Sequence, residues 1–498
     1  MNVNPITRLD YPDPDVIRVE DTYYMVSTTM HFMPGCEILQ SFDLVHWEHA
    51  TYVYETLDHT DAQQLKSGQN IYGQGMWAAS LRYHEGRFYI CFVANDTRKT
   101  YLYTSEKIDG PWKKQLIEGF YHDGSLLFDE DGRNYIVYGN DEIWITELNE
   151  DLTAPKKDGL HRLLVSDHKN PELGYEGSHI QKINGYYYIF LVHSLRDRWM
   201  RTEACFYSDS LEGEFTGGDV LCDDRGYCGQ GVAQGGIVDT PDGKWYAMLF
   251  QDSGAVGRLP ILLPVTWKDH FPVFGQNGHV PEEIEVHSTR PGYIYQPLVG
   301  SDDFCNGLLP RWQFNHDPDP QYYHLDALQG TYTITTREVC TELTQAVNTL
   351  TQRMSYPSCA AEVTVDASAL KEGDVAGLCA LQGCYAAVGI TKHHGKYEVL
   401  MLDKKEDGIL DMTEGTVVES HQMDFRLEAD FCNMKDEARC YYRVNKGDWL
   451  PIGTVHKLYF KLDHFTGCRF GLFCYAAEET GGSACFRDFK YYDVDEIS

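Results

Sequence analysis

Residues 185–192 read GYYYIFLV, a turn glycine followed by tyrosines and an apolar run, and this pattern decides the fold. The same turn-and-strand segment occurs five times in the first 250 residues. Its other four copies are DTYY at 21–24, GRFY at 86–89, GRNY at 132–135 and GKWY at 243–246. Copies about 45 to 65 residues apart, each with room for a four-stranded sheet, are typical of a β-propeller. The sequence therefore predicts five blades.

A residue suited to chemistry precedes most copies at nearly the same distance. Counting back twelve residues from the last tyrosine of the second to fifth copies gives Trp77, Asp123, Glu176 and Gln234, and counting back eleven from the first gives Asp13. Because the innermost strands of a propeller converge on its axis, residues at one phase face each other across a funnel. Single acidic residues often only cap turns, but three at one phase predict a shared pocket of the kind that glycoside hydrolysis requires.

Composition and charge narrow the class of protein. With 498 residues, 43% hydrophobic and 13% aromatic, the chain can build two or more domains with sizeable cores. A net charge of −33 argues against nucleic acid or an anionic membrane surface as a partner, because phosphate binding depends on basic patches. The fifteen cysteines are odd in number, scattered and without a CxxC pair, so we predict reduced core residues and no zinc site.

The sequence also gives an expectation about location. Residues 1–10, MNVNPITRLD, contain no apolar core of a signal peptide, and no stretch approaches the roughly 18 apolar residues of a membrane span. We therefore expect a cytoplasmic protein without membrane contact.

The pattern changes after the fifth repeat. The propeller signal ends at WKDHFPVFG, residues 267–275, and short alternating strands such as AEVTVD at 361–366 and YEVLML at 397–402 follow beyond about residue 300. We predict an all-β chain of two domains, a five-bladed catalytic propeller at residues 1–295 and a β-sandwich of the jelly-roll type at 300–498. The second domain shows no catalytic cluster of its own.

Five short motifs carry a family resemblance. They are YPDPDVIR at 11–18, MWAA at 76–79, HDGSL at 122–126, YEGSH at 175–179 and GR at 257–258. In this order and spacing they resemble the motifs of glycoside hydrolase family 43. The segments NTLTQR at 348–353 and FRDF at 486–489 are similar to the concanavalin-like sandwich appended to many β-xylosidases of that family. The resemblance covers nearly the entire chain.

The resemblance implies a role for each site residue. Asp13 matches the general base and Glu176 the general acid of an inverting hydrolase, whose carboxyl groups lie about 6.5 to 9.5 Å apart so that a water fits between them. Asp123 matches the aspartate that orients the acid and raises its pKa, since a nearby anion disfavours a second negative charge. Trp77 matches a position that offers an apolar face to the sugar, and Arg258 one that hydrogen-bonds sugar hydroxyls.

The chain departs from the family pattern at two places. Gln234 stands where many members have a histidine that helps to hold a hydrated calcium ion on the propeller axis. A glutamine carbonyl is an acceptable calcium ligand, but one amide with waters makes a weak site, and the chemistry itself requires no cofactor. Met30 stands where many β-xylosidases have an aromatic residue, and we expect Met30 and His31 to reshape the sugar pocket.

These observations predict an inverting exo-glycosidase that releases terminal β-D-xylosyl residues from xylooligosaccharides, with α-L-arabinofuranosidase side activity. The first alternative is an enzyme that acts primarily on arabinofuranosides or arabinan, because the two sugars present similarly placed hydroxyls. The second is a non-catalytic carbohydrate-binding propeller, although such a module has little need for three acidic groups at one phase. The expected partners are xylooligosaccharides and arabinose-containing hemicellulose fragments, and association into a homo-oligomer is left open.

Overall fold

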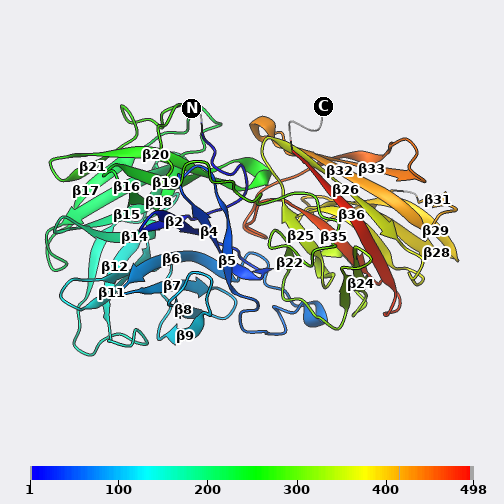
Figure 1. The fold of residues 1–498 in the computed structure, drawn as a ribbon, viewed down its shortest axis with the longest axis horizontal. Helices are drawn as coiled ribbons and strands as arrows, with labels where there is room; N and C mark the ends of the chain where they lie inside the picture. Colours follow the sequence, from blue (N-terminus) through cyan, green and yellow to red (C-terminus); the bar gives the residue numbers. More distant parts are fainter. Residues whose placement is uncertain (1–2, 414, 494–498) are drawn as a thin grey trace.

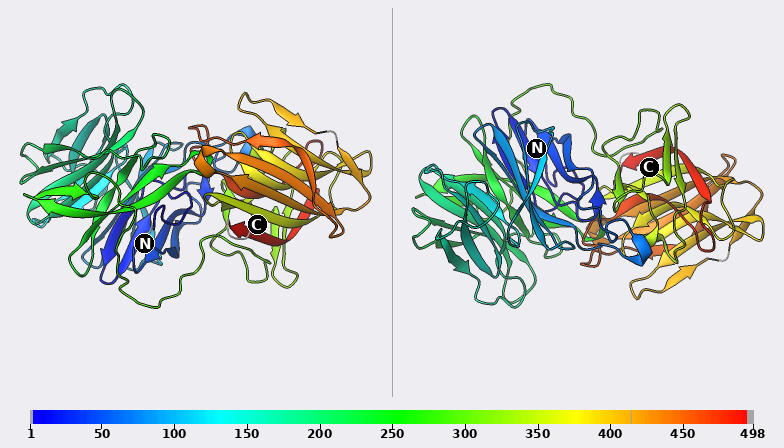
Figure 2. Two further views of the ribbon diagram at one scale, coloured as in Figure 1. Left: turned by 90° about the horizontal axis from the view of Figure 1, so that it is seen from above. Right: turned by 90° about the horizontal axis from the view of Figure 1, so that it is seen from below.

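The computed structural model describes residues 3–413 and 415–493, and its regular structure consists of β-strands and short 3-10 turns. Two bodies lie side by side along the long axis, the N-terminal half of the chain in one and the C-terminal half in the other (Figure 1). They are also distinct when seen from above and from below (Figure 2). The predicted all-β fold, a five-bladed propeller followed by a sandwich, is confirmed.

Each propeller blade is a four-stranded antiparallel sheet. The first two blades are β1 (Asp15–Val19), β2 (Thr22–Val26), β4 (Gly35–Ser41) and β5 (Glu48–Tyr54), then β6 (Met76–His84), β7 (Arg87–Ala94), β8 (Lys99–Ser105) and β9 (Lys113–Ile117). The third and fourth are β10 (Ser125–Phe128), β11 (Asn134–Asn140), β12 (Glu142–Leu148) and β13 (His161–Ser166), then β14 (Glu176–Ile183), β15 (Tyr186–Ser194), β16 (Arg201–Ser208) and β17 (Thr216–Leu221). The fifth is β18 (Val232–Asp239), β19 (Trp245–Asp252), β20 (Arg258–Lys268) and β21 (Phe271–Phe274).

The sequence repeat marks the turn into the second strand of every blade. In the fourth blade Gly185, with φ +84°, makes the turn between β14 and β15, a backbone conformation that costs glycine little. Tyr187, Tyr188 and the apolar residues that follow them are buried between neighbouring blades, and Tyr186 is partly buried. The first strands of adjacent blades contact one another around a closed ring, β1 to β6, β10, β14, β18 and back to β1.

A partly buried guanidinium lies at the centre of this ring. Arg82, on β6, donates from Nη1 to Asp15 Oδ2 of β1 at 2.7 Å and from Nε to the Leu126 carbonyl of β10 at 2.9 Å. It also reaches the Ile180 carbonyl of β14 from Nη2 at 3.3 Å. Burial opposes ionisation of Asp15, but Arg82 and His179 hold its pKa below the ordinary value. One side chain therefore contacts three other innermost strands.

The C-terminal body consists of two stacked antiparallel sheets. One contains β22 (Gln313–Asn315), β25 (Leu350–Arg353), β35 (Arg469–Tyr475), β27 (Val375–Leu381), β28 (Ala386–His393), β29 (Lys396–Lys404), β30 (Leu410–Met412) and β31 (Thr416–Val418). The other contains β23 (Tyr323–Asp326), β24 (Thr331–Thr335), β36 (Ser483–Asp493), β26 (Ser358–Asp366), β32 (Gln422–Asp430), β33 (Glu437–Val444) and β34 (Leu450–Lys457). Trp312, Phe425 and Phe470 are among the side chains buried between the sheets.

Four 3-10 turns, η1 (Lys66–Gly68), η2 (Gly254–Val256), η3 (Leu343–Gln345) and η4 (Cys432–Met434), lie in the connections. The predicted domain boundary at 295–300 falls in the connection between β21 and β22, and the predicted outer limits at residues 1 and 498 lie outside the described residues. In the part of the chain that the structure describes, no helical segment has the length and apolar character needed to cross a membrane.

The two domains share hydrogen bonds and a buried ion pair. Strand β3 (Phe32–Met33) leaves the first blade and pairs with β22 at the edge of a sandwich sheet. From β25, Arg353 donates to Glu37 Oε2 at 2.8 Å and to the Asp10 carbonyl at 2.9 Å, both in the propeller. The sandwich is therefore held in a defined position against the propeller.

All fifteen cysteines are unpaired, and nine of them are buried. The prediction that they are core residues is wrong for Cys222, Cys228, Cys305 and Cys432, which are exposed. These four lie in loops and in η4, where no apolar pattern surrounds them.

Three buried histidines, His31, His316 and His464, form a layer between the domains. The ring of His31 lies 4.8 Å from that of His316 and 5.8 Å from that of His464. His316 Nε2 accepts the backbone N–H of Ile71 at 2.9 Å, and Tyr72 stacks on His464 at 3.9 Å. Burial lowers the pKa of all three imidazoles, to about 4 for His464. The layer is therefore neutral at neutral pH.

This layer predicts acid lability of the folded protein. The folded pKa values lie below the unfolded value of about 6.5, so the stability contribution of each histidine is complete above pH 6.5 and is lost as pH falls toward the folded pKa. The loss is about 1.4 kcal/mol per pH unit for each histidine that stays neutral. We expect the free energy of unfolding of His31→Phe, measured by urea denaturation between pH 6.5 and 5, to fall less steeply than that of the wild type. His324→Gln, at an exposed site, should keep the wild-type slope. Equal slopes for wild type and His31→Phe would contradict this account.

Candidate active site

A cavity of about 740 Å³ opens where the innermost strands of the propeller begin. Seven of the eight residues that the sequence singled out line it, namely Asp13, Met30, Trp77, Asp123, Glu176, Gln234 and Arg258. The sandwich supplies further wall residues, namely Met434, Phe460, Lys461, Leu462 and Phe465. Both domains therefore enclose the space into which the carboxylates project.

Irregular backbone near the start of the innermost strands directs these side chains into the cavity. Asp13, Asp123 and Gln234 adopt left-handed φ values of 53°, 47° and 64°, which non-glycine residues seldom adopt. The register of β14 shifts directly after Glu176, and β18 is interrupted in the same way beside Gln234. Gly177 has φ +65°, and a Cβ there would lie 2.7 Å from Gln234 Cγ, so only glycine fits between the fourth and fifth blades. Such bulges redirect side chains toward a site.

Asp13 is held as an ion-paired carboxylate. Arg258 Nη1 lies 3.0 Å from its Oδ1, and the Thr28 hydroxyl donates to Oδ2 at 2.6 Å. Arg258 is 2% exposed, yet its Nε and Nη2 have no hydrogen-bond partner in the described part of the chain. The ring of Phe465 lies 4.3 Å from the guanidinium carbon. This arginine can therefore fix the base with one nitrogen and offer other N–H groups to a ligand.

Asp123 and Glu176 both lie beside the same imidazole, that of His122. Asp123 Oδ2 accepts the backbone N–H of Gly177 at 2.9 Å and lies 3.5 Å from His122 Nε2. Glu176 Oε2 accepts the Asn140 amide at 2.7 Å and lies 3.3 Å from the same imidazole nitrogen. Burial, together with the charges of Glu176 and Asp13, raises the pKa of Asp123 to about 6 although His122 opposes this. The protonation of Asp123 therefore depends on both neighbouring carboxyl groups and on His122.

Aromatic and apolar side chains, among them Trp77 and Met30, form part of the cavity wall. Trp77 lies between the rings of His122 and Phe465, at centroid distances of 5.9 Å and 5.6 Å. Its buried indole N–H has no hydrogen-bond partner in the described residues. Met30 is fixed by two backbone hydrogen bonds to Met76, at 3.0 and 3.1 Å. This surface suits the apolar face of a sugar ring.

The structure contradicts the expectation that His31 shapes the sugar pocket directly. Its side chain is fully buried in the histidine layer between the domains and does not line the cavity. The chain turns at Met30, where φ is 53°, so that the two neighbouring side chains lie in different environments. Of these two residues, only Met30 lines the cavity.

The surroundings of Gln234 fit a calcium ion poorly. Its backbone N–H donates to Glu203 Oε2 at 2.7 Å, and Glu203 is fully buried, which raises the pKa of its carboxyl group well above the ordinary value. Calcium takes six to eight oxygen ligands and favours ionised carboxylates. One amide oxygen beside a neutral acid supplies little of this, so no step of the chemistry is assigned to a metal.

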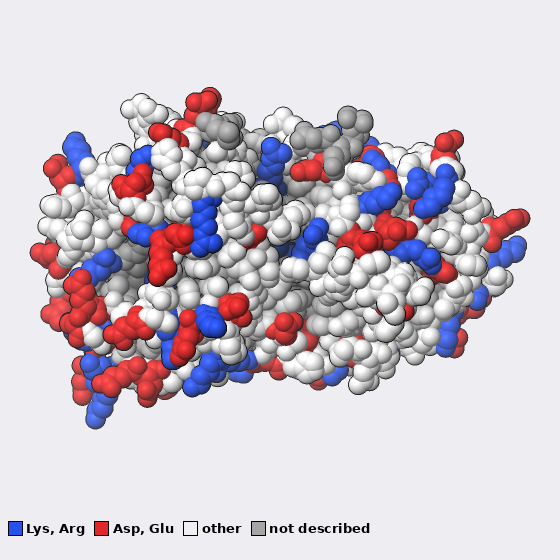
Figure 3. Space-filling view, viewed as in Figure 1, with Lys and Arg blue, Asp and Glu red and all other residues white. Residues whose placement is uncertain are grey.

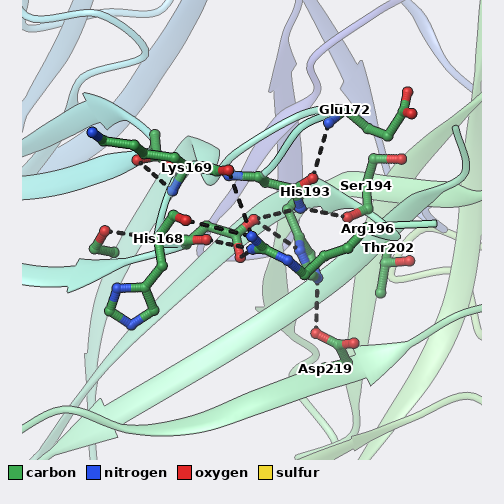
Figure 4. Close-up of polar contacts among 12 residues, drawn as sticks. His168, Lys169, Glu172, His193, Ser194, Arg196, Thr202 and Asp219 are labelled. Carbon is green, nitrogen blue, oxygen red and sulfur yellow. Dashed lines mark hydrogen bonds and ion pairs between the residues drawn. The ribbon is translucent and has the colours of Figure 1, made fainter. Parts of the chain in front are cut away.

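A polar network fixes the loop that leads into Glu176 (Figure 4). His193 bridges two carboxylates, with Nδ1 3.2 Å from Asp167 Oδ2 and Nε2 2.8 Å from Asp219 Oδ1. Arg196 donates to the Asp167 carbonyl at 2.6 Å. Residues 172–173, on the same loop, line the cavity. The network thus holds both a wall of the cavity and the approach to the acid.

The sequence did not indicate several other contributors to the site, among them His122, Asn140 and Phe465. His122 stands inside the HDGSL motif, and its position beside Asp123 was the only signal for it. Asn140 ends β11 and has no motif of its own. Phe465 comes from the sandwich, outside every propeller repeat. Only tertiary structure brings Asn140 and Phe465 to the cavity.

Comparisons with known proteins agree with this arrangement. Residues 3–272 match the family model described as glycosyl hydrolases family 43, and residues 301–492 match that of the beta xylosidase C-terminal concanavalin A-like domain. The chain is 26% identical to a beta-xylosidase of Formosa agariphila, over 99% of this chain and 89% of the relative. It is 24% identical to a xylosidase/arabinosidase of Butyrivibrio fibrisolvens, over 99% of both chains.

A solved structure extends the likeness. The structure described as a bifunctional GH43-CE protein of Bacteroides eggerthii superimposes with a TM-score of 0.92 at 42% identity. The match covers 99% of this chain and 64% of that protein, so this chain spans about two thirds of its length.

Proposed function

This chain belongs to family 43 of the glycosyl hydrolases, and we propose that it removes terminal β-D-xylosyl residues from xylooligosaccharides with inversion of configuration. The observation that carries the proposal is the cavity in which Asp13, Asp123 and Glu176 come together from three different blades. Relatives named beta-xylosidase and xylosidase/arabinosidase that match over nearly the whole chain support the choice of a pentoside.

The proposed reaction is a single displacement at the anomeric carbon. Asp13 takes a proton from a water molecule as the water oxygen bonds to the anomeric carbon. The bond from that carbon to the glycosidic oxygen breaks, and Glu176 gives its proton to the departing oxygen. The products are xylose of inverted configuration and a shortened oligosaccharide. Asp13 then releases its proton and Glu176 regains one from solvent.

The charges of the site suit these roles. Arg258 and Thr28 stabilise the ionised form of Asp13, as a base requires. Burial and the charges of Glu176 and Asp13 raise the pKa of Asp123 to about 6. A carboxylate beside a general acid disfavours a second negative charge, and this is the role proposed for Asp123.

The shape of the cavity supports action at chain ends. The sandwich residues Phe460 and Phe465 close a side of the space that the propeller alone would leave open. Such a pocket favours a terminal sugar over the middle of a long chain. On the face shown in Figure 3, acidic and basic side chains are intermixed, without a broad basic patch that would suit a polyanion.

A second candidate is hydrolysis of α-L-arabinofuranosides. The relative from Butyrivibrio fibrisolvens is named for both activities. Met30 lies in the wall where the sugar would bind, and its unbranched side chain can pack against either pentose. Arabinose-containing hemicellulose fragments are therefore proposed as additional substrates.

The assignment of the acid predicts a leaving-group effect. Glu176→Ala should lower kcat/KM on xylobiose by about 10²- to 10⁴-fold, the usual contribution of general acid catalysis. The loss should be much smaller on an aryl xyloside whose phenolate departs without protonation. Asp13→Ala should lose activity on both substrates, because each needs the activated water. Glu150→Gln, at an exposed turn, controls for removal of a negative charge. Near-normal hydrolysis of xylobiose by Glu176→Ala would show that another group is the acid.

Substrate preference separates the candidate functions. We expect a higher kcat/KM on 4-nitrophenyl β-D-xylopyranoside than on 4-nitrophenyl α-L-arabinofuranoside, and release of xylose from xylobiose and xylotriose. Faster turnover of the arabinofuranoside, with little action on xylobiose, would favour the second candidate. Binding of xylotriose without any turnover would instead indicate a carbohydrate-binding propeller.

A further inference from the structure

His122 occupies a position between the two carboxyl groups that govern proton donation. Its Nε2 atom lies 3.3 Å from Glu176 Oε2 and 3.5 Å from Asp123 Oδ2. The side chain is 21% exposed and lines the cavity, beside Trp77. An imidazole so placed can interact with both carboxyl groups through one nitrogen.

The charge of this imidazole follows from its neighbours. Burial by itself lowers the pKa of His122, but Asp123, Glu176 and Asp13 together raise it to about 9. Asp13 contributes to the pKa of His122 only through its charge. Its own hydrogen-bond and ion-pair partners are Arg258 and Thr28. His122 is therefore an imidazolium at neutral pH.

The hydrogen bonds distinguish the two oxygens of Glu176. Oε2 faces two N–H donors, Asn140 Nδ2 at 2.7 Å and His122 Nε2 at 3.3 Å. A proton on Oε2 would point a hydroxyl at groups that are themselves donors. Oε1 has no hydrogen-bond partner among the described residues. The catalytic proton therefore belongs on Oε1, the oxygen left free for a ligand.

We propose that His122 is a positioning residue that directs the proton of Glu176 to Oε1 and stabilises the carboxylate left when this proton is transferred. The proposal deepens the hydrolase function above and rests on it. Asp123 and Asp13 oppose ionisation of the acid, whereas the His122 cation favours it. The negative charge that develops on Glu176 in the transition state thus meets a fixed cation.

The pH dependence of the reaction tests this role. His122→Gln keeps an N–H donor but removes the charge. An opposite charge at this range changes a carboxyl pKa by about 1 to 3 units, so the alkaline limb of the kcat/KM profile should move upward by about one pH unit or more. The plateau rate on an unactivated pentoside should fall at least about tenfold, with a smaller loss on an activated aryl glycoside. His84→Gln, at the other end of the propeller, should leave the profile unchanged.

The outcomes distinguish an electrostatic effect of His122 on the acid from a merely structural role of His122. A lower rate with an unmoved alkaline limb would overturn the proposal, because loss of packing alone does not change the titration of the acid. A downward shift of the limb would also overturn it, since the sign would be opposite to that of a lost cation. The profiles are compared on whichever pentoside the wild type cleaves faster, so an error in the proposed substrate does not imitate either result.

A measurement without turnover makes the test independent of the proposed function. The imidazole of His122 is followed by NMR in protein with labelled histidine, with His122→Gln identifying its signal. We expect titration near pH 9 in the wild type and a clearly lower midpoint in Glu176→Gln, which removes one anionic partner. Titration near pH 6.5 in both proteins would contradict the proposal, whether or not the enzyme cleaves xylosides.

Discussion

The guanidinium of Arg82 on the propeller axis fixes the geometry beneath the active site. It bonds to Asp15 of β1, to Ser125 of β10 and to the Ile180 carbonyl of β14, and Asp15 in turn lies 3.1 Å from His179 Nδ1. Each proposed catalytic carboxylate lies two or three residues before one of these contacts, since Asp13 precedes Asp15, Asp123 precedes Ser125 and Glu176 precedes His179. A buried ion pair stabilises only when its remaining polar atoms are satisfied, and here neighbouring backbone and hydroxyl groups satisfy them. The network thus fixes the relative positions of three blades and stabilises their packing.

The charges in the active-site cavity, next to this network, are also compensated. Three carboxyl groups at one end of a propeller would repel one another strongly in a partly buried space. Arg258 neutralises Asp13 on one side of the cavity, while His122 lies between Asp123 and Glu176 on the other. The base is therefore stabilised as an anion and the acid remains under competing influences. The sandwich adds apolar closure through Phe465, and β3 and the Arg353–Glu37 pair hold the sandwich in place.

The fold and the carboxylates could be predicted because both depend on local, repeated signals. A turn before an apolar run recurs in each blade, and counting back from it reaches Asp13, Asp123 and Glu176 without knowledge of tertiary structure. Phe465 and Asn140 belong to no repeat, and only the packing of distant segments places them at the cavity. His31 follows Met30 in the sequence, but the pairing of β3 with the sandwich buries it elsewhere. The four exposed cysteines also differ from the prediction, because composition does not report which loops remain outside a core.

The stereochemistry of hydrolysis tests the central claim most directly, namely that Asp13 activates water on one face of the sugar while Glu176 protonates the leaving oxygen on the other. Proton NMR of the enzyme acting on xylobiose, recorded before mutarotation, shows which anomer of xylose appears first. We expect α-xylose from the non-reducing end, because a single displacement inverts the β-linkage. Initial release of β-xylose would require a covalent intermediate and would contradict the assignment of Asp13 as a base acting on water.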